Sequence, residues 1–219
     1  MKKKIFALVL ILTMLLTLTA CGSDADKLVG TWKCEVDLSK NINDVIRLGL
    51  DGMDLEEEVI AYLYADSFNY VFYCEFNKDG TYSVSADVDA LEASVDAYRA
   101  KLTEDFPRYL VASVYAGTGM ELSVDEILAA SDISSVEEAV EVMLPTVESL
   151  VEIADKEGKF EVKDGKLFST DGLDESIDYE SYETYVLDDG TLAILDHVGE
   201  GSSAWYSLAE SYPVVFEKA

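Results

Sequence analysis

Three turns of the same kind constrain what this chain can fold into more than any other feature. In each of them Asp-Gly lies between two apolar runs, at Asp79-Gly80, Asp164-Gly165 and Asp189-Gly190. Glycine adopts the positive φ that a tight hairpin turn requires, and aspartate tolerates the position before it. Each turn therefore predicts two antiparallel strands, which gives six strands in three pairs.

Two further strands complete the set. Segments rich in β-branched and aromatic residues, with alternation of period two, span residues 28–37, 69–87, 159–170 and 179–218. That pattern is typical of strands with one buried face. Adding residues 29–37 at the start and 212–218 at the end to the three hairpins makes eight strands.

Helical periodicity fills the two remaining segments, around residues 40–66 and 88–157. Pro107 suits the first turn of a new helix within the second segment. A capping box joins a residue at the helix start to an acidic residue three positions later. Three such pairs are Asp54 with Glu57, Ser123 with Glu126, and Ser134 with Glu137.

The order of these elements predicts an α+β fold. One strand is followed by a short helical stretch, a hairpin, about 70 residues of helix and then five strands. The first and last strands must meet if the sheet is to close. We therefore expect one antiparallel β-domain over residues 28–219, a barrel or strongly curved sheet of about eight strands. A helical subdomain, residues 88–157, is inserted between the third and fourth strands.

The N-terminal segment predicts export. After three lysines, residues 5–16 are almost wholly apolar, and residues 18–21 (Leu-Thr-Ala-Cys) are typical of a bacterial lipobox. A transmembrane anchor is an alternative for which the apolar run is short, and an ordinary signal peptide would not need the cysteine. We expect residues 1–20 to be removed as a signal peptide and Cys21 to carry lipid such as palmitate. Residues 21–27 would then tether the domain to the extracytoplasmic side of the cell membrane, at the cell surface or the periplasmic face.

The charge of the chain excludes some partners. The sequence has 44 acidic and 16 basic residues, and three of the basic ones lie in the signal segment, so the mature chain has a formal charge of −31. A field this negative argues against nucleic acid and anionic membrane surfaces. It favours a solvated exported protein, whose acidic surface serves solubility alone or attracts cations and basic ligands. Apolar residues make up 49% of the chain, enough to form a core.

A family resemblance follows from the first strand. Gly30-Thr31-Trp32 begins that strand, and most of the eight strands are joined as simple hairpins. Together these features resemble lipocalin-like (calycin) proteins, which are up-and-down barrels whose first strand carries Gly-x-Trp. Residues 77–82 and 212–218 are also similar to segments of small lipocalin-like lipoproteins of bacteria. Such barrels usually pair the tryptophan with a late arginine, whereas here Lys218 is the late cation nearby in register, and lysine stacks less well.

Strand alternation places two cysteines on apolar, inward faces. Trp32 and Cys34 share one face of the first strand, and Phe72 and Cys74 share one face of the second. An exported compartment permits disulfides. If the two strands are neighbours, we expect a Cys34–Cys74 disulfide that closes a loop of about 40 residues and stabilises the fold by roughly 3–4 kcal/mol. The alternative is two buried free thiols.

The resemblance implies a binding protein rather than an enzyme. We expect a small apolar or amphipathic ligand inside the barrel, lined by the inward aromatic residues Trp32, Phe72, Tyr82 and Phe160. The alternative is that these four side chains fill the core, as they do in many small barrels. A second hypothesis is a surface module that docks another exported protein through the acidic helical insertion. An enzyme is the third.

The sequence shows no clear catalytic or metal-binding motif. The single histidine, His197, adjoins Asp196, but neighbours on a strand point to opposite faces, so the two cannot act as base and orienter. The serines at 202–203 lack the spacing of a nucleophile elbow. The acidic residues in 51–54 and 87–89 lack the frame of a calcium loop. We therefore expect no catalytic residue, no metal site and no cofactor.

Overall fold

The computed structural model describes residues 24–200, 205 and 212–219, and in this part of the chain eight strands form a closed antiparallel barrel. The strands follow one another around the barrel in chain order, and β1 closes on β8. They are β1 (Gly30–Asp37), β2 (Asn69–Phe76), β3 (Thr81–Ala86), β4 (Lys156–Lys163), β5 (Lys166–Ser169), β6 (Tyr182–Asp188), β7 (Thr191–Val198) and β8 (Val214–Lys218). This confirms the predicted antiparallel barrel of about eight strands.

The three Asp-Gly turns join the strand pairs as predicted. They connect β2 to β3, β4 to β5 and β6 to β7. The glycines Gly80, Gly165 and Gly190 have φ values of 83°, 72° and 86°. At such positive φ the backbone of most residues with a Cβ is strained, whereas that of glycine is not. The glycines therefore determine where each hairpin reverses.

Helices form a separate lobe beside the barrel, and two insertions build it. Between β1 and β2 lie α3 (Ser39–Gly49), α4 (Glu57–Ile60) and the 3-10 helix η1 (Ala61–Leu63). Between β3 and β4 lie α5 (Val88–Thr118), α6 (Val124–Ala130), α7 (Val136–Met143) and α8 (Val147–Ala154). We call residues 39–63 and 88–154 the helical lobe. The predicted insertion between the third and fourth strands is confirmed, and the shorter helical stretch after β1 packs against it.

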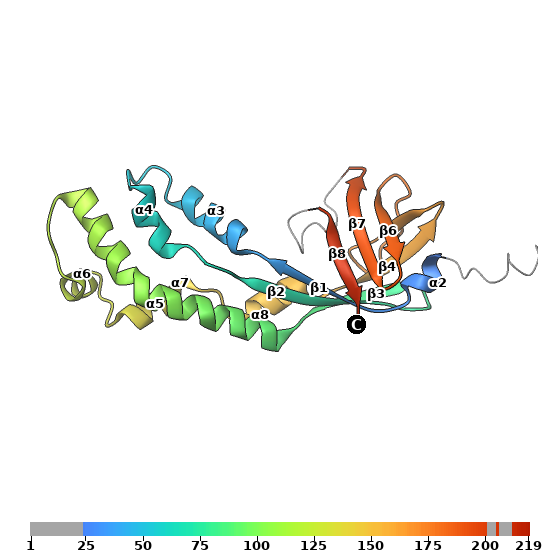
Figure 1. Cartoon of the computed structure of the whole chain (residues 1–219), viewed down its shortest axis with the longest axis horizontal. Coiled ribbons are helices and arrows are strands. Elements are labelled where there is room, and N and C mark those ends of the chain that lie inside the picture. Colours follow the sequence, from blue (N-terminus) through green and yellow to red (C-terminus); the bar gives the residue numbers. More distant parts are fainter. Residues whose placement is uncertain (1–23, 201–204, 206–211) are drawn as a thin grey trace, which may run out of the picture.

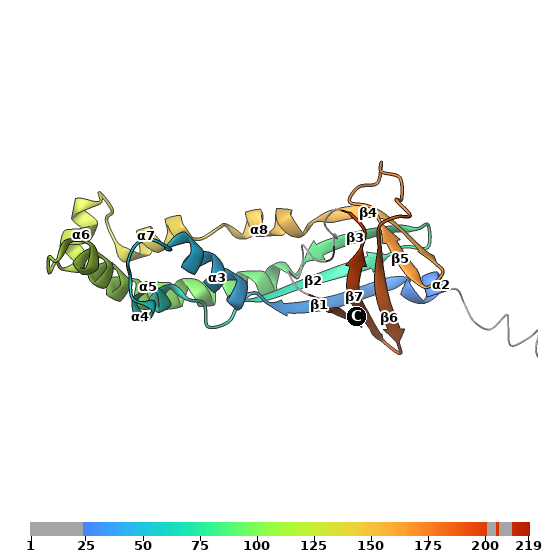
Figure 2. The ribbon, with the colours of Figure 1, turned by 90° about the horizontal axis from the view of Figure 1, so that it is seen from above.

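The molecule is elongated. Figure 1 shows the helical lobe at one end of the long axis and the barrel toward the other, where α2 (Asp24–Leu28) also lies. Seen from above in Figure 2, β1 and β2 run from the barrel toward the lobe. The lobe and the start of the described chain therefore lie at opposite ends.

The helix starts agree with the capping boxes only in part. Ser123 and Glu126 form the predicted capping box at the start of α6. The third box is shifted by one residue, because Ser135 caps α7 by accepting a hydrogen bond from the N–H of Glu138. The first box is wrong: Asp54 has φ 52°, which is not the extended conformation of a cap, and α4 starts only at Glu57.

Pro107 does not begin a new helix, because it lies inside the continuous helix α5. Proline removes one backbone hydrogen bond from a helix interior and crowds the preceding turn. Packing next to the proline offsets that cost: Phe106 is buried, and its ring stacks on the half-buried Tyr109 at a centroid distance of 5.8 Å. Tertiary packing thus keeps the helix continuous through a residue that locally opposes it.

Aromatic side chains pack inside the barrel. The ring of Phe76 lies 4.8 Å from that of Phe160 and 5.8 Å from that of Trp205, measured between centroids. The Trp205 ring lies 5.1 Å from that of Tyr82 and 6.0 Å from that of Phe216. We call these rings, together with Trp32 and Phe72, the aromatic core of the barrel.

Gly158 makes room for this core. It lies directly opposite Tyr82 in the β3–β4 pair. A Cβ atom at position 158 would be 2.2 Å from the backbone oxygen of Thr170 and 2.6 Å from Cε1 of Tyr82. The Tyr82 hydroxyl donates a 2.7 Å hydrogen bond to that same Thr170 oxygen. The ring and the carbonyl thus fit together only over a residue without a side chain.

We expect Gly158→Ala to lower the free energy of unfolding by about 1–3 kcal/mol, because the methyl group would push apart well-packed atoms. Gly117→Ala is the matched control: a Cβ there meets nothing within 4 Å, and Gly117 lies in α5. The control should be neutral or stabilising by about 0.5–1 kcal/mol. Urea unfolding followed by tryptophan fluorescence measures both, and equal stability of the two variants would contradict the packing argument.

The predicted Cys34–Cys74 disulfide is wrong: both cysteines are free and buried. The strands are neighbours and both side chains face inward, as expected, but Cys34 lies opposite Phe72 and Cys74 lies opposite Trp32. The two cysteines are therefore diagonal neighbours, whose Cβ atoms are typically about 7 Å apart. A disulfide requires a Cβ–Cβ distance of about 4 Å. The structure thus has the alternative arrangement of two buried thiols.

We expect both thiols to resist alkylation in the folded protein. Burial raises the pKa of Cys34 to about 12 and holds the pKa of Cys74 well above its usual value. The reactive thiolate is therefore scarce at pH 8, and access is blocked as well. Iodoacetamide should modify neither cysteine under native conditions and both in guanidinium chloride, as measured by peptide mapping. Recovery of a Cys34–Cys74 disulfide peptide would contradict this expectation.

Candidate functional site

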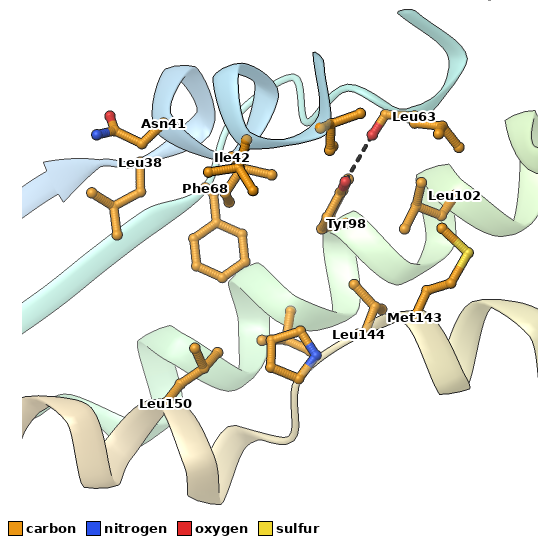
Figure 3. Close-up of a pocket in the computed structure, with 14 residues that line it drawn as sticks. Leu38, Asn41, Ile42, Leu63, Phe68, Tyr98, Leu102, Met143, Leu144 and Leu150 are labelled. Atoms are coloured by element: carbon orange, nitrogen blue, oxygen red, sulfur yellow. Dashed lines mark hydrogen bonds between the residues drawn. The ribbon is translucent and has the colours of Figure 1, made fainter. Parts of the chain in front are cut away.

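An apolar cavity of about 400 Å³ lies in the helical lobe, next to the ends of β1 and β2. Figure 3 shows α3 on one side, α5 across the middle and the α7–α8 connection on the other side. Its wall is made of Leu38, Asn41, Ile42, Val45, Ile46, Leu63, Phe68, Val95, Tyr98, Leu102, Met143, Leu144, Pro145 and Leu150. Twelve of these fourteen side chains are hydrocarbon or thioether, so the cavity suits an apolar group.

Helical spacing brings the wall together. On α3, Ile42 and Ile46 are four residues apart and so share a face. On α5, Val95, Tyr98 and Leu102 follow the same rule. The α5 stripe is visible in the sequence, where it indicates an ordinary packing face. In the structure this face packs against the lobe and at the same time lines the cavity.

Polar contacts fix the floor of the cavity. The Tyr98 hydroxyl donates a 2.7 Å hydrogen bond to the backbone oxygen of Leu63, visible in Figure 3. Burial raises the pKa of Tyr98 to about 12, so the hydroxyl keeps its proton and remains a donor. The Phe68 ring meets the Tyr98 ring edge-on at 6.4 Å between centroids. The shape of this floor is thereby set by one hydrogen bond and one ring contact.

A second set of contacts holds α3 against the end of β2. The Asp37 carboxylate accepts hydrogen bonds from the N–H groups of Phe68 (3.0 Å) and Ser39 (2.9 Å). These bonds hold the pKa of Asp37 below its usual value. Asn43 exchanges two hydrogen bonds with the backbone of Ala65, at 3.0 and 2.7 Å. The cavity wall therefore has a fixed position relative to the barrel.

The cavity reaches solvent near Val45 and Met143. These two lining residues are 69% and 48% exposed. Among the described residues of the wall none carries a charge. The helical lobe around it holds 20 acidic and 5 basic residues. The mouth of an apolar cavity therefore lies in a strongly negative surface.

The four residues predicted to line a ligand pocket lie elsewhere. Trp32, Phe72, Tyr82 and Phe160 are buried in the barrel, where they belong to the aromatic core, and none of them is part of the cavity wall. Their positions agree with the alternative given above, in which these side chains fill the core of the barrel. Phe76 touches the rings of both Tyr82 and Phe160 and so links two of the four.

Lys218 takes the place next to Trp32 that the family resemblance assigns to a late cation. The two residues are paired between β1 and β8, and the Lys218 ammonium lies 5.4 Å from the centroid of the Trp32 ring. The indole N–H of Trp32 donates a 2.6 Å hydrogen bond to the backbone oxygen of Leu28. A cation over a tryptophan face contributes about 0.5–1 kcal/mol at exposed sites.

Sequence reasoning missed the partners of His197. Its Nδ1 lies 3.1 Å from a carboxylate oxygen of Glu183, and its Nε2 lies 3.4 Å from Oγ of Ser181. The prediction that the ring does not pair with the Asp196 side chain is confirmed. The Asp196 carboxylate instead accepts a hydrogen bond from the backbone N–H of His197. Glu183 lies opposite His197 because the register shifts between Thr184 and Tyr185, and the sequence pattern does not indicate that shift.

Some predicted features concern residues outside the described part of the chain. They are the signal segment 1–20, Cys21 and the next two residues of the tether, and the serines at 202–203, whereas residues 24–27 of the tether lie in α2. No helix in the described ranges is long and apolar enough to cross a membrane. Within residues 24–200, 205 and 212–219, no group of three or more His, Cys, Asp or Glu side chains is placed to hold a metal ion.

In comparisons with known proteins, no family model, no curated protein and no solved structure matches the chain. The barrel is shared by many unrelated functions, so the fold alone does not assign one. The resemblance to lipocalin-like proteins therefore stays a prediction.

Proposed function

We propose that this protein is an exported, lipid-anchored binding protein without enzymatic activity toward its ligand, and that it holds a small amphipathic molecule in the cavity of the helical lobe. The observation that carries the proposal is an apolar cavity of about 400 Å³ beside a barrel whose interior is occupied by its own aromatic rings. A ligand-binding role thus moves from the barrel, where the sequence suggested it, to the lobe.

The wall chemistry defines the ligand class. A volume of 400 Å³ is within the range of about 300–1,000 Å³ that is typical of small-molecule sites. Burying an apolar chain there gains about 25 cal/mol per Å² of surface removed from water. The polar part of the ligand would remain at the mouth, near Val45 and Met143. Because the lobe is strongly acidic, an uncharged or cationic head group is favoured over an anionic one.

The shape of the molecule supports an outward-facing site. The proposed anchor at Cys21 precedes α2 by only a few residues, and α2 lies at the end of the long axis opposite the lobe. A short tether keeps that end close to the bilayer. The cavity is then held away from the membrane surface, where solutes of the extracytoplasmic space reach it.

We expect Cys21→Ser to release the protein from the membrane. Without the thiol no lipid can be attached. Incorporation of a palmitate analogue and fractionation of cells measure the effect. The wild type should carry the label and sediment with membranes, whereas the variant should do neither. A wild-type protein that carries no label would contradict a lipid anchor.

We expect a neutral fluorescent apolar probe, N-phenyl-1-naphthylamine, to bind the protein, and Ile42→Trp to weaken that binding about tenfold or more, equivalent to about 1.4 kcal/mol. The larger side chain would occupy cavity volume that the probe needs. Leu48→Trp is the matched control, since Leu48 lies on the same helix, is 70% exposed and is not part of the wall. Thermal unfolding of both variants shows that they fold.

Competition identifies the ligand class. Alkyl alcohols and alkylammonium ions should displace the probe, and alkyl carboxylates of equal chain length should do so less well. Equal probe binding by the wild type and Ile42→Trp would contradict the proposed site. Native mass spectrometry of protein purified from its own host should show a reproducible added mass that Ile42→Trp lacks.

Exposed apolar residues favour a second candidate function, docking of another exported protein on the lobe. Val142 (82% exposed) lies directly beside Met143 at the mouth of the cavity, and Ile153 is also largely exposed. Exposed apolar patches mark interaction surfaces. Val142→Asp separates the two functions: it should abolish docking of a protein partner and leave binding of the neutral probe unchanged.

A further inference from the structure

A serine, a histidine and a glutamate form a row at one end of the β6–β7 pair. Ser181 directly precedes β6, Glu183 is its second residue, and His197 is the last residue but one of β7. Glu183 and His197 are opposite each other in the register, and the side chains of residues two apart on a strand share a face. Oγ of Ser181 lies 3.4 Å from Nε2 of His197, and Nδ1 of His197 lies 3.1 Å from the Glu183 carboxylate.

A buried carboxylate lies beside the ring and can orient it. Glu183 is 2% exposed, and a carboxylate is costly to bury unless hydrogen-bond donors face it. His197 supplies one of them when its proton sits on Nδ1. The neutral ring then presents the lone pair of Nε2 to Ser181. A histidine in this state can take a proton from the serine hydroxyl.

The backbone around Ser181 is built for close approach. Gly199 has φ 134°, and a Cβ there would lie 2.7 Å from Cα of Ser181 and 2.9 Å from the backbone oxygen of Glu180. Only glycine allows β7 to end so close to the serine. Ser181 itself is half-buried, so its hydroxyl combines a shielded setting with access from solvent.

We propose that Ser181 is a nucleophile that accepts an acyl group from a small uncharged carboxylic ester, with His197 as its general base and Glu183 as the positioning residue. Oγ attacks the carbonyl carbon, and its proton passes to Nε2 of His197. The bond from that carbon to the alcohol oxygen breaks, and the alcohol leaves with the proton from His197. Water then attacks the acyl-serine by the same route in reverse, which releases the carboxylic acid and restores the serine.

This row is independent of the cavity in the helical lobe. Its three residues belong to the barrel strands β6 and β7 and their flanks, and none of them is part of the cavity wall. The 3.4 Å between Oγ of Ser181 and Nε2 of His197 is somewhat longer than the range of about 2.6–3.2 Å for a nucleophile and its base, which is usual in proteins without bound substrate. The 3.1 Å between His197 and Glu183 lies within that range.

A neutral fluorophosphonate tests the proposal directly, because it needs only the first half of the reaction. Oγ of Ser181 would form a bond to phosphorus, the phosphorus–fluorine bond would break, fluoride would leave and the proton would pass through His197 to buffer. We expect a single covalent adduct on the purified wild-type protein, mapped to Ser181 by peptide mass spectrometry. The same protein should release one equivalent of p-nitrophenol from p-nitrophenyl acetate in a burst.

Variants assign the roles. Ser181→Ala should abolish the adduct, and His197→Gln should slow its formation about 100-fold or more, the usual size of general-base assistance. Glu183→Gln should slow it as well, and Glu183→Asp should restore part of the rate. Ser169→Ala is the matched control, because Ser169 is a half-buried serine at the end of β5 and should leave labelling unchanged.

The outcomes separate clearly. A folded wild-type protein that gives no adduct at Ser181 would overturn the proposal, whatever the variants do. Labelling of Ser181 at an unchanged rate in a folded His197→Gln variant would overturn the assignment of the base. Thermal unfolding of each variant identifies those that fold. If Glu183→Gln does not fold, the adduct and the burst of the wild type still test whether Ser181 is a nucleophile.

Discussion

Aromatic rings from four strands meet inside the barrel, and this packing determines where the molecule can bind anything else. Rings from β2, β3, β4 and β8, together with Trp205, lie within about 6 Å of their neighbours there. Interiors of proteins are packed as densely as organic crystals, so a ligand would have to displace side chains that hold the barrel together. Gly158 shows how tight the fit is, since even a methyl group would meet Tyr82 and the Thr170 carbonyl.

The helical lobe provides the room that the barrel lacks, and one of the joints that hold it in place lies at the ends of β1 and β2. The N–H of Leu38 donates to the oxygen of Phe68 at 2.8 Å, and Asp37 accepts from the N–H of the same Phe68. Leu38 and Phe68 both belong to the cavity wall. The hydrogen-bonded ends of β1 and β2 therefore continue directly into the site, and the barrel acts as the rigid base on which the cavity is built.

Local signals in the sequence were enough to predict the strands but not the cavity. Asp-Gly turns, alternation and the Ser123 capping box each depend on a few consecutive residues, and the structure has them where they were predicted. The cavity instead needs Ile42, Val95 and Leu150, which lie on three helices far apart in the sequence. Each looks like an ordinary core residue on its own helix. An unfilled volume between such faces depends on how the helices pack, which periodicity does not reveal.

Strand register explains why the disulfide prediction was wrong and why the partner of His197 was missed. Alternation correctly placed Cys34 and Cys74 on inward faces, but β1 and β2 are joined through the helices of the lobe, so no turn fixed their register. A shift of two residues keeps every face and changes every partner, which is why the cysteines lie diagonally. On β6 and β7 the turn does fix the register, and by that count Glu183 would face Asp196. The irregularity between Thr184 and Tyr185 moves the pairing by one residue and brings Glu183 opposite His197 instead. A single bulge thus replaces a repulsive pair of carboxylates with the histidine–glutamate contact on which the proposed nucleophile depends.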